Sequence, residues 1–210
     1  MNYLKIKRII DFILSITGLI VLSPIFLFLI IAIKIDSKGP ILFKQKRVGI
    51  NMTYFNMLKF RTMSIDTPKD IPTHLMESPE KYITKVGKFL RKTSLDELPQ
   101  IFNIMNGTMS CIGPRPALWN QFDLIAERDK YGANAIRPGL SGLAQINGRD
   151  KLSISCKAKL DGDYVNTVSF GVDVKCFLKT AIKVFRCEGI VEGRTKIVEH
   201  KATDTTEELN

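Results

Sequence analysis

The hydrophobic positions of the chain are concentrated in one run near the N-terminus, from Phe12 to Ile33, which holds 22 residues and no charge. A straight helix of this length would be about 33 Å long, which is enough to cross the hydrocarbon core of a bilayer. The run is too long for a signal peptide, and Lys34-Ile35-Asp36 follows it instead of a small-residue cleavage site. The pattern therefore predicts a membrane helix, with a fully buried helix of a soluble protein as the alternative.

The middle of this run is interrupted by Ser23-Pro24. Pro24 lacks an N–H and clashes with the carbonyl four residues earlier, so the helix must kink there, and Ser23 can bond back to a freed carbonyl. A spanning helix normally carries its basic excess on one side only. Here both flanks are basic, with Lys5, Lys7 and Arg8 before the run and Lys34, Lys38, Lys44, Lys46 and Arg47 after it. A helix that enters, bends at Ser23-Pro24 and leaves by the same face, and an ordinary Pro-kinked spanning helix, are equally compatible with the pattern.

The remainder of the chain contains short segments with the hydrophobic periodicity of strands and others with that of helices. Short strands are predicted at 41–43 and 54–60 with a turn at 49–51, and helices at 82–91, 98–105, 121–131 and 172–185. Residues 64–80 are polar and rich in proline, and 136–149 are rich in turns. The expected class is α with minor β: a membrane helix over 1–35, one domain over 36–202 resting on the membrane, and a polar tail over 203–210.

The net charge of the chain indicates an anionic partner but does not distinguish one class of anion from another. The chain has 31 Lys and Arg against 21 Asp and Glu, a formal net charge of +10. A basic body attracts nucleic acid, anionic lipid or phosphate-bearing small molecules. The four cysteines form no Cys-x-x-Cys pair, and His74 and His200 lie near none of them, so a structural zinc site is not expected. Scattered cysteines are typical of reduced thiols in the cytosol.

The segment from Arg91 to Gln100 has the highest density of residues capable of chemistry. Its structural interpretation is a capping box, in which Ser94 caps a helix and Glu97 reaches back to the N–H of the cap. That interpretation does not explain why Asp96 stands beside Glu97, close behind Arg91 and Lys92. Two neighbouring carboxylates can hold Mg²⁺ between them and a substrate phosphate, or act as a nucleophile and a metal ligand.

Three further motifs carry arginine or lysine in a defined setting. In Gly113-Pro114-Arg115-Pro116 the prolines restrict the backbone around a guanidinium that could clamp a phosphate, the alternative being a solvated arginine in a turn. Lys59 and Arg61 alternate with Phe60, so a strand would direct both cations to one face as a diphosphate patch or a solvated surface. The glycines that follow Arg137-Pro138 allow close backbone approach, and Arg137 and Arg149 could meet an anion there.

Together these segments resemble the monotopic phosphoglycosyl transferases, also called the bacterial sugar transferase family. The resemblance covers roughly residues 7–180 and rests on the order of the motifs more than on any one of them. The matching residues are Lys7-Arg8 with Asp11, Ser23-Pro24, Gly39-Pro40, Gln45, Arg47, Gly49, Lys59 to Met63, Arg91, Leu95 to Gln100, Met109-Ser110, Gly113 to Pro116, Arg137 to Gly139, Ala144-Gln145, Gly148-Arg149, Asp161 and Tyr164.

The resemblance implies a re-entrant helix broken at Ser23-Pro24 and a catalytic domain with interfacial amphipathic helices on the cytoplasmic face of the bacterial inner membrane. It also implies that Asp96 attacks the β-phosphate of a UDP-sugar, that UMP leaves, and that polyprenyl (undecaprenyl) phosphate then takes the phosphosugar from the aspartyl intermediate. Glu97 corresponds to the carboxylate on the metal side, with Mg²⁺ on the diphosphate. The residues implied to line the phosphate and nucleotide region are Arg91, Arg115, Lys59, Arg61, Arg137 and Asp161. A homodimer is left open.

Other implications are less direct. Similar members of minimal form, which this chain resembles, often use UDP-linked N-acetylated hexosamines. Many relatives have a tryptophan before the late Asp–Tyr segment, whereas this chain has only Trp119, which leaves the sugar or nucleotide contact near Asp161 open. The alternative function is a membrane-anchored basic protein that binds anionic lipid or nucleic acid. It predicts a recognisable module of interleaved aromatic and basic residues, which the sequence lacks, so nucleic acid is not expected as a partner.

Overall fold

The computed structural model of the chain describes residues 3–67, 79–148 and 151–185. Its helices are α1 (Tyr3–Asp36), α2 (Lys85–Thr93), α3 (Gln100–Met105), α4 (Phe122–Asp129), α5 (Leu143–Ile146), α6 (Ile154–Thr167) and α7 (Phe170–Phe185). Its strands are β1 (Leu42–Val48), β2 (Tyr54–Phe60), β3 (Ser110–Ile112) and β4 (Gly139–Ser141). The prediction of an α class with minor β is confirmed. The tail at 203–210, Arg149 and most of the predicted loop at 64–80 lie outside the described residues.

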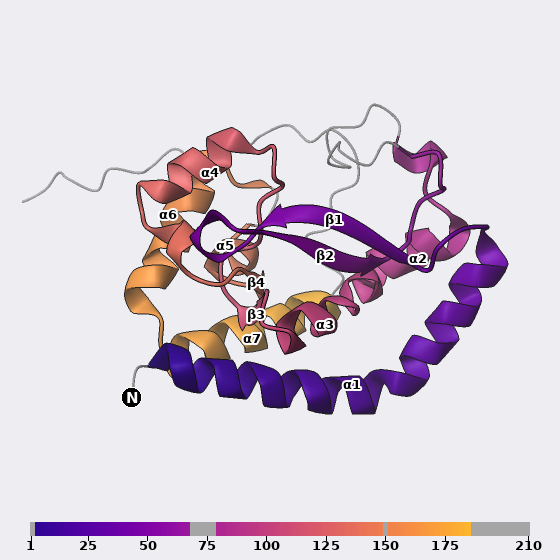
Figure 1. Cartoon of the computed structure of the whole chain (residues 1–210), viewed down its shortest axis with the longest axis horizontal. Coiled ribbons are helices and arrows are strands. Elements are labelled where there is room, and N and C mark those ends of the chain that lie inside the picture. Colours follow the sequence, from indigo (N-terminus) through magenta and orange to yellow (C-terminus); the bar gives the residue numbers. More distant parts are fainter. Residues whose placement is uncertain (1–2, 68–78, 149–150, 186–210) are drawn as a thin grey trace, which may run out of the picture.

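Helix α1 runs along one side of the molecule and then turns away from its first direction (Figure 1). Pro24 lies inside the helix, and the Ser23 hydroxyl donates to the carbonyl of Ile20 at 2.8 Å. That carbonyl is four residues before Pro24 and is the one that the proline leaves without its N–H partner. The predicted bond from Ser23 to a freed carbonyl is therefore confirmed, and it keeps α1 continuous through the bend.

The side of α1 that packs against the rest of the chain changes character at Pro24. Before it the buried residues are polar, namely Lys7, Asp11 and Ser15, and after it they are apolar, namely Phe26, Leu29 and Ile33. The apolar part packs with Phe60 of β2, Leu90 of α2 and residues of α3 in one core cluster. A helix that is apolar in composition is thus fixed to the domain by polar contacts in its first half and by core packing in its second.

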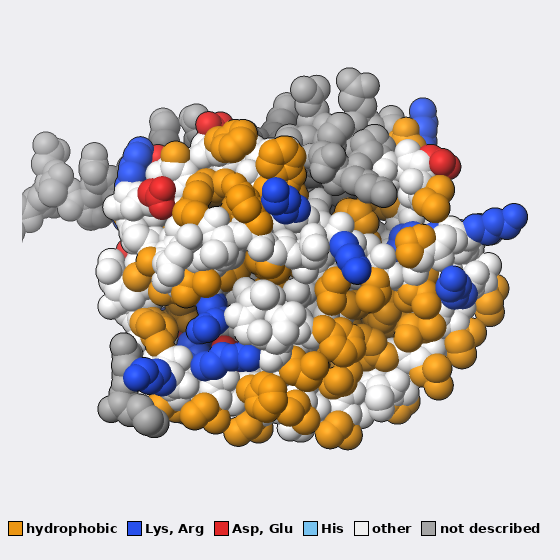
Figure 2. All heavy atoms as spheres, viewed as in Figure 1, with side chains coloured by type: hydrophobic (Ala, Val, Ile, Leu, Met, Phe, Trp, Pro, Cys, Tyr) orange, Lys and Arg blue, Asp and Glu red, His pale blue; other side chains and the backbone are white. Residues whose placement is uncertain are grey.

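The outward side of α1 is apolar and exposed. Only 17% of its most apolar stretch is buried, which argues against the buried helix of a soluble protein. In the described part of the chain, α1 is the one helix with the length and composition to cross a membrane. Figure 2 shows hydrophobic side chains along the edge that α1 forms. Helix α7 adds a second exposed apolar face, formed by Phe170, Val174, Phe177, Leu178 and Ile182.

The polar contacts of α1 reach the far end of the sequence. Lys7 Nζ lies 2.5 Å from Asp173 Oδ2 on α7, and both side chains are almost fully buried. Tyr3 and Tyr164 also donate to the Asp173 carboxylate, each at 2.6 Å. Because a buried charge is stable only when it is paired and hydrogen-bonded, this cluster fixes the rotation of α1 about its axis.

Further contacts of α1 come from Asp11. Its carboxylate accepts from the Ser110 hydroxyl at 2.7 Å and from the Cys111 N–H at 3.0 Å, which attaches α1 to β3. Gly18 lets α1 approach α3, since a Cβ there would lie 3.0 Å from Ile101 Cδ1. The first half of α1 is therefore in contact with β3, α3 and α7.

The β1–β2 pair forms an antiparallel hairpin in register from Leu42↔Phe60 to Val48↔Tyr54, and β3 pairs with β4 in parallel. The predicted second strand has the observed bounds, whereas β1 continues to Val48, well beyond the predicted 41–43. Residues Lys44 to Arg47 of this strand are all basic or polar and show no apolar alternation, which hid the strand. The predicted helices at 82–91, 98–105, 121–131 and 172–185 correspond to α2, α3, α4 and α7 with shifted ends. Helix α6 was missed because its buried side holds Asp161 and Gly162 and so lacks an apolar stripe.

Replacing Asp173 with Asn should strongly destabilise the protein, because Lys7 would keep its charge in a buried position without an anionic partner. Breaking a buried pair in this way costs about 3–5 kcal/mol, or roughly 10 °C in the thermal midpoint of a domain of this size. Thermal unfolding of the purified chain in detergent measures the shift. Glu127→Gln is the matched control, since it breaks the exposed Lys130–Glu127 pair and should change the midpoint little. Equal midpoints for the two variants would show that the Lys7–Asp173 pair does not hold α1.

Candidate active site

The two adjacent carboxylates stand at the junction between α2 and α3. Helix α2 ends at Thr93, and its C-cap residue, Ser94, adopts a left-handed conformation with φ 57° and ψ 14°. The chain then makes one 3-10 turn, Leu95–Glu97, before α3 begins. A left-handed residue that is not glycine is uncommon and reverses the chain sharply, and this reversal presents Asp96 and Glu97 on a short, constrained turn.

The capping box expected at this junction is wrong. The Ser94 side chain caps no N–H. Its backbone N–H closes α2 by donating to Arg91 O, and its carbonyl accepts from the Glu97 N–H at the start of the 3-10 turn. The Glu97 side chain turns to Lys59 and Arg115. Charge-assisted bonds to two cations are stronger than a single bond from a backbone N–H, so the pairing of charges decides where Glu97 points.

Glu97 and Asp96 share a cluster with cations from distant parts of the chain. Lys59 Nζ, on β2, lies 2.8 Å from Glu97 Oε1 and 3.5 Å from Asp96 Oδ2. Both terminal nitrogens of Arg115 donate to the Glu97 carboxylate, at 2.5 Å and 3.4 Å, in a bidentate arrangement. Asp96 is only 8% exposed. Lys59, Asp96, Glu97 and Arg115 are all candidates from the sequence, and the structure brings them into contact.

Burial decides the electrostatics of Asp96. The pKa of Asp96 is raised, chiefly because burial disfavours the charged form, and the negative charge of Glu97 adds to the rise. Lys59, Arg91 and Arg115 act in the opposite direction and lower this pKa. The carboxylate is thus poorly hydrated yet surrounded by positive charge, a setting in which a weakly solvated anion can attack an electrophile.

Arg115 is held by backbone packing around Gly113. A Cβ on Gly113 would lie 2.6 Å from the carbonyl oxygen of Arg137, so only glycine permits this approach. The predicted close backbone approach at the glycines after Arg137-Pro138 is confirmed, and the partner is the backbone of Gly113. On the other side, Leu140 O accepts from Arg115 at 3.4 Å and Arg47 donates to Pro116 O at 3.0 Å. The Pro–Arg–Pro segment is therefore fixed on both sides.

Arg91 completes the cationic surroundings from α2. Its Nε donates to the Thr62 hydroxyl at 2.9 Å. Gly87 makes this contact possible, because a Cβ there would lie 2.0 Å from the Thr62 carbonyl oxygen. Arg91 thus reaches the site because α2 packs directly on the chain that leaves β2.

The other predicted phosphate-binding residues have different partners. Both terminal nitrogens of Arg61 donate to carbonyls of the turn after α1, those of Ser37 and Lys38. Lys59 and Arg61 therefore do not form the common patch that their alternation predicted, since β2 ends at Phe60. Asp161 is buried in an ion pair with Arg128 at 2.6 Å, and Arg137 donates to Gly107 O at 2.9 Å.

Sequence reasoning missed two buried partners, Arg128, which pairs with Asp161, and Asp173, which pairs with Lys7. Both are buried charged residues on helices. A buried charge implies a partner, but its burial and the identity of that partner, 33 residues away for Arg128 and 166 for Asp173, carry no local signal.

The donor set suits a magnesium ion that is shared with a substrate. Among residues 3–67, 79–148 and 151–185, no group of three or more His, Cys, Asp or Glu side chains converges on one point. Mg²⁺ is commonly held by one or two carboxylates together with water and substrate phosphates. Asp96 and Glu97 fit that requirement, and they do not fit a closed site made of protein ligands alone.

Comparison with known proteins identifies the family of the chain. Residues 2–187 match the family model of the bacterial sugar transferases, and the chain belongs to this family. It is 38% identical over 185 residues to the uncharacterised sugar transferase EpsL of Bacillus subtilis, covering 88% of this chain and 90% of that protein. It is 37% identical to the UDP-glucose:undecaprenyl-phosphate glucose-1-phosphate transferase of Klebsiella pneumoniae (85% of this chain, 40% of that protein). It is 33% identical to the undecaprenyl-phosphate galactose phosphotransferase of Salmonella typhimurium (88% and 41%). The chain thus spans about two-fifths of the length of the last two relatives.

Asp96→Asn should stabilise the folded protein at neutral pH. The raised pKa means that folding works against the ionised form of Asp96, so the native state loses stability as pH rises from the ordinary carboxyl range through the raised pKa. The neutral amide avoids this penalty. The gain in thermal midpoint over the wild type should therefore grow with pH through that window and then level off, in unfolding scans over a pH series.

The control is Glu97→Gln, which should lower the midpoint, since it removes the charge that pairs Lys59 and Arg115. A gain from Asp96→Asn that does not change with pH would contradict the raised pKa.

Proposed function

We propose that the chain transfers a sugar-1-phosphate from a UDP-sugar to polyprenyl (undecaprenyl) phosphate and releases UMP. The observation that supports this most directly is a buried aspartate in a cluster of cations, with Glu97 beside it holding Lys59 and Arg115. Membership of the bacterial sugar transferase family supports the same class of reaction. A protein that only binds a ligand would not require a buried carboxylate with a raised pKa beside this group of cations.

In the first step, an oxygen of the Asp96 carboxylate attacks the β-phosphorus of the donor. The bond from that phosphorus to the bridging oxygen breaks, the bridging oxygen leaves with UMP, and a phosphosugar-aspartyl intermediate remains. Arg115 and Lys59 lie where they can transfer their bonds from Glu97 to the diphosphate as negative charge develops on the leaving phosphate. Arg91 contributes positive charge beside Asp96.

In the second step, a phosphate oxygen of the lipid acceptor attacks the same phosphorus and Asp96 departs as a carboxylate. The product is the polyprenyl-diphospho-sugar. Glu97 and Asp96 are the residues that would hold a Mg²⁺ ion, which would neutralise the negative charge that develops on the departing UMP in the first step. Burial of Asp96 also protects the acyl phosphate from hydrolysis between the two steps.

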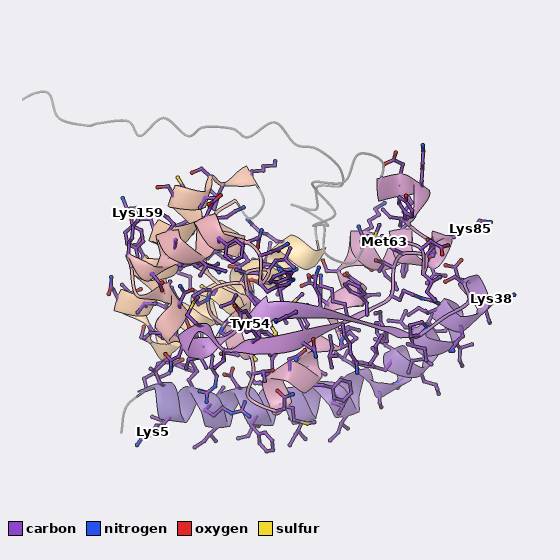
Figure 3. The ribbon with its side chains drawn as sticks, turned by 45° about the horizontal axis from the view of Figure 1, so that its top comes forward. Lys5, Lys38, Tyr54, Met63, Lys85 and Lys159 are labelled. Atoms are coloured by element: carbon purple, nitrogen blue, oxygen red, sulfur yellow. The ribbon has the colours of Figure 1, made fainter. Side chains whose placement is uncertain are left out.

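We further infer that α1 is re-entrant and that α7 lies in the membrane interface, with the catalytic domain on the cytoplasmic face of the inner membrane. The bend at Pro24 and the exposed apolar faces of α1 and α7 support this placement. Lys38 and Lys85 lie at the end of the molecule where α1 finishes (Figure 3), in a position to meet lipid phosphates. The membrane helix would then comprise residues 1–35 and the catalytic domain residues 36–202.

For the donor we propose a UDP-linked N-acetylated hexosamine. One relative is named as a glucose-1-phosphate transferase and another as a galactose phosphotransferase. A panel of UDP-sugars in a UMP-release assay is therefore the direct test of the donor. The product would supply the first membrane-bound unit of a surface polysaccharide or a glycoprotein glycan.

Asp96→Asn should lower UMP release by about 10³-fold or more, since loss of a nucleophile removes the covalent route. Intact-mass spectrometry of the wild type, incubated with donor and Mg²⁺ but without lipid acceptor, should show a phosphosugar adduct that the variant lacks. Asp163→Asn on the exposed side of α6 is the matched control and should behave as wild type. An adduct of equal yield on the Asp96→Asn variant would exclude Asp96 as the nucleophile.

Pro24→Leu should straighten α1 and favour a spanning helix, because the lost i→i−4 hydrogen bond is restored and the clash with Ile20 O is removed. An N-terminal cysteine tag, in a background without the native cysteines, is labelled by a membrane-impermeant maleimide in whole cells only if it faces outward. We expect little labelling in the wild type and clear labelling in the variant. Strong labelling of the wild type would refute the re-entrant arrangement.

A further inference from the structure

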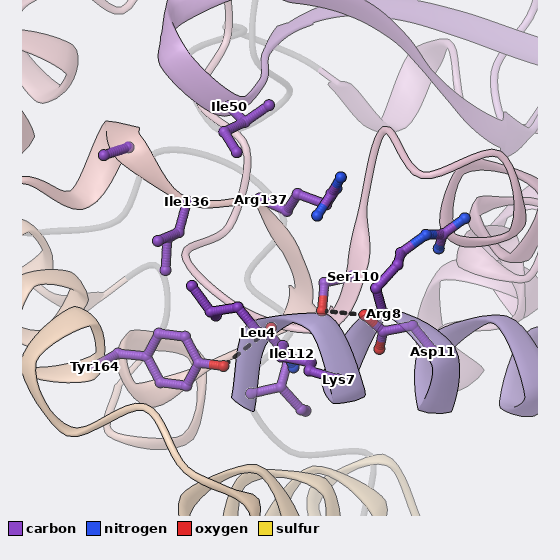
Figure 4. A pocket seen from close by; sticks show the side chains of 11 residues that line it. Leu4, Lys7, Arg8, Asp11, Ile50, Ser110, Ile112, Ile136, Arg137 and Tyr164 are labelled. Carbon is purple, nitrogen blue, oxygen red and sulfur yellow. Dashed lines mark hydrogen bonds between the residues drawn. The ribbon is translucent and has the colours of Figure 1, made fainter. Parts of the chain in front are cut away.

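A small cavity lies beside the first turns of α1, separate from the carboxylate pair. Its volume is about 60 Å³, and its walls come from α1, the tip of the β1–β2 hairpin, β3 and the chain before β4 (Figure 4). Three basic side chains line it, those of Lys7, Arg8 and Arg137, together with the single carboxylate of Asp11. The cavity therefore carries an excess of positive charge.

Two of these cations converge on the end of α3. The terminal nitrogens of Arg8 donate to the carbonyls of Ile104 and Met105, at 2.6 Å and 2.7 Å. Arg137 donates through Nε to the carbonyl of Gly107, and a Cβ on Gly107 would lie 3.2 Å from Arg8 Nη2. Both guanidinium groups therefore meet around one residue of the backbone.

Arg137 differs from the other charged side chains of the cavity in the hydrogen-bond donors that it leaves available. Lys7 is neutralised by Asp173, and Asp11 accepts from Ser110 and Cys111. In the described ranges, the two terminal nitrogens of Arg137 have no hydrogen-bond partner. A guanidinium offers five N–H donors, and two parallel ones match the oxygens of a phosphate. The cavity thus combines a surplus of charge with a free fork of donors.

We propose that this cavity binds the phosphate group of a membrane phospholipid, with the terminal nitrogens of Arg137 as the binding donors and Arg8 as the second cation. The carbonyls at the end of α3 hold the two arginines in place, and the lipid phosphate bridges them. This proposal rests on the membrane placement of α1 inferred above.

The surroundings of Arg8 favour a lipid over a free anion. The guanidinium lies 5.9 Å from the centre of the Phe12 ring, and Phe12 is 44% exposed on the outward apolar side of α1. Leu4, which lines the cavity, is also exposed. Figure 2 shows basic side chains gathered beside this part of α1, directly above the hydrophobic edge. A phospholipid carries its phosphate at the same boundary between apolar and polar surroundings.

The phosphate in this cavity is not the one that reacts. Asp96 and Glu97 precede α3, whereas Arg8 and Arg137 bind the backbone at its other end. The six residues of α3 separate the two places by about 9 Å along the helix. A lipid held here anchors the first half of α1 to the interface and leaves the reaction site open.

Native mass spectrometry of the full chain in non-ionic detergent tests this site, without donor or Mg²⁺. The probe is dioctanoyl phosphatidylglycerol, with dioctanoylglycerol as the phosphate-free comparison. We expect the wild type to retain one phosphatidylglycerol and no dioctanoylglycerol. Arg137→Gln, which keeps a donor for Gly107 O but removes the charge and the fork, should weaken retention at least tenfold. Lys159→Gln, a loss of the same charge at an exposed position on α6 (Figure 3), should not.

Four outcomes would overturn the proposal. They are retention by folded Arg137→Gln equal to wild type, equal loss of retention in Lys159→Gln, displacement of the lipid by inorganic phosphate at the same concentration, and preferred retention of farnesyl phosphate, which would make this an acceptor site. If Arg137→Gln does not fold, Arg137→Lys replaces it and should still bind more weakly, because an ammonium cannot form two parallel bonds. The Asp96→Asn variant should retain the lipid, so failure of the catalytic proposal and failure of this one give different results.

Discussion

The buried ion pair between Lys7 and Asp173 is the contact on which the arrangement of the molecule depends. It joins α1 to α7, and the Tyr3 and Tyr164 hydroxyls complete the hydrogen bonding of the Asp173 carboxylate. Because burying charge is costly unless every polar group finds a partner, the pair permits only one rotation of α1. That rotation directs the apolar side of α1 outward and the side bearing Asp11 toward β3. Core packing around Phe26 then fixes the half of α1 beyond the bend.

The candidate active site depends on a second set of paired charges, those of Asp96 and Glu97 with the cations around them. Two carboxylates on one short turn would repel each other strongly if they were buried alone. Cations from β2, α2 and the Pro–Arg–Pro segment converge on them, so that each carboxylate has positive charge within reach. The result is asymmetric: Glu97 holds two cations directly, while Asp96 is more weakly paired and has a raised pKa. In the proposed reaction, this asymmetry would allow Asp96 to act as the nucleophile while Glu97 organises the surrounding charge.

The sequence revealed local features better than long-range partners. The apolar run, the proline bend, the β2 strand and the Asp–Glu pair all have signals within a few residues, and the structure shows each where it was expected. The capping box failed because the left-handed conformation of Ser94 cannot be read from its neighbours. Arg61 and Asp161 looked like ligand contacts but bind other parts of the chain, since an arginine or aspartate in a motif looks the same whether it holds a substrate or a turn. Arg115 was a candidate because prolines restrict its backbone, and Lys59 because it alternates with Phe60 in a strand. Their contact with Glu97 required the fold.

The separation of Lys7 from Asp173 along the chain also sets an order of biosynthesis. The two residues are 166 positions apart, so α1 leaves the ribosome long before its partner on α7 exists. At typical elongation rates of 5–20 residues per second, the interval is about 10–30 s. Throughout it, the apolar side of α1 can enter lipid while Lys7 and Asp11 stay in contact with water at the surface. A helix that inserted fully during this time would carry Lys7 and Asp11 toward the hydrocarbon before Asp173 and Ser110 exist to pair with them, and this cost favours the interfacial placement proposed for α1.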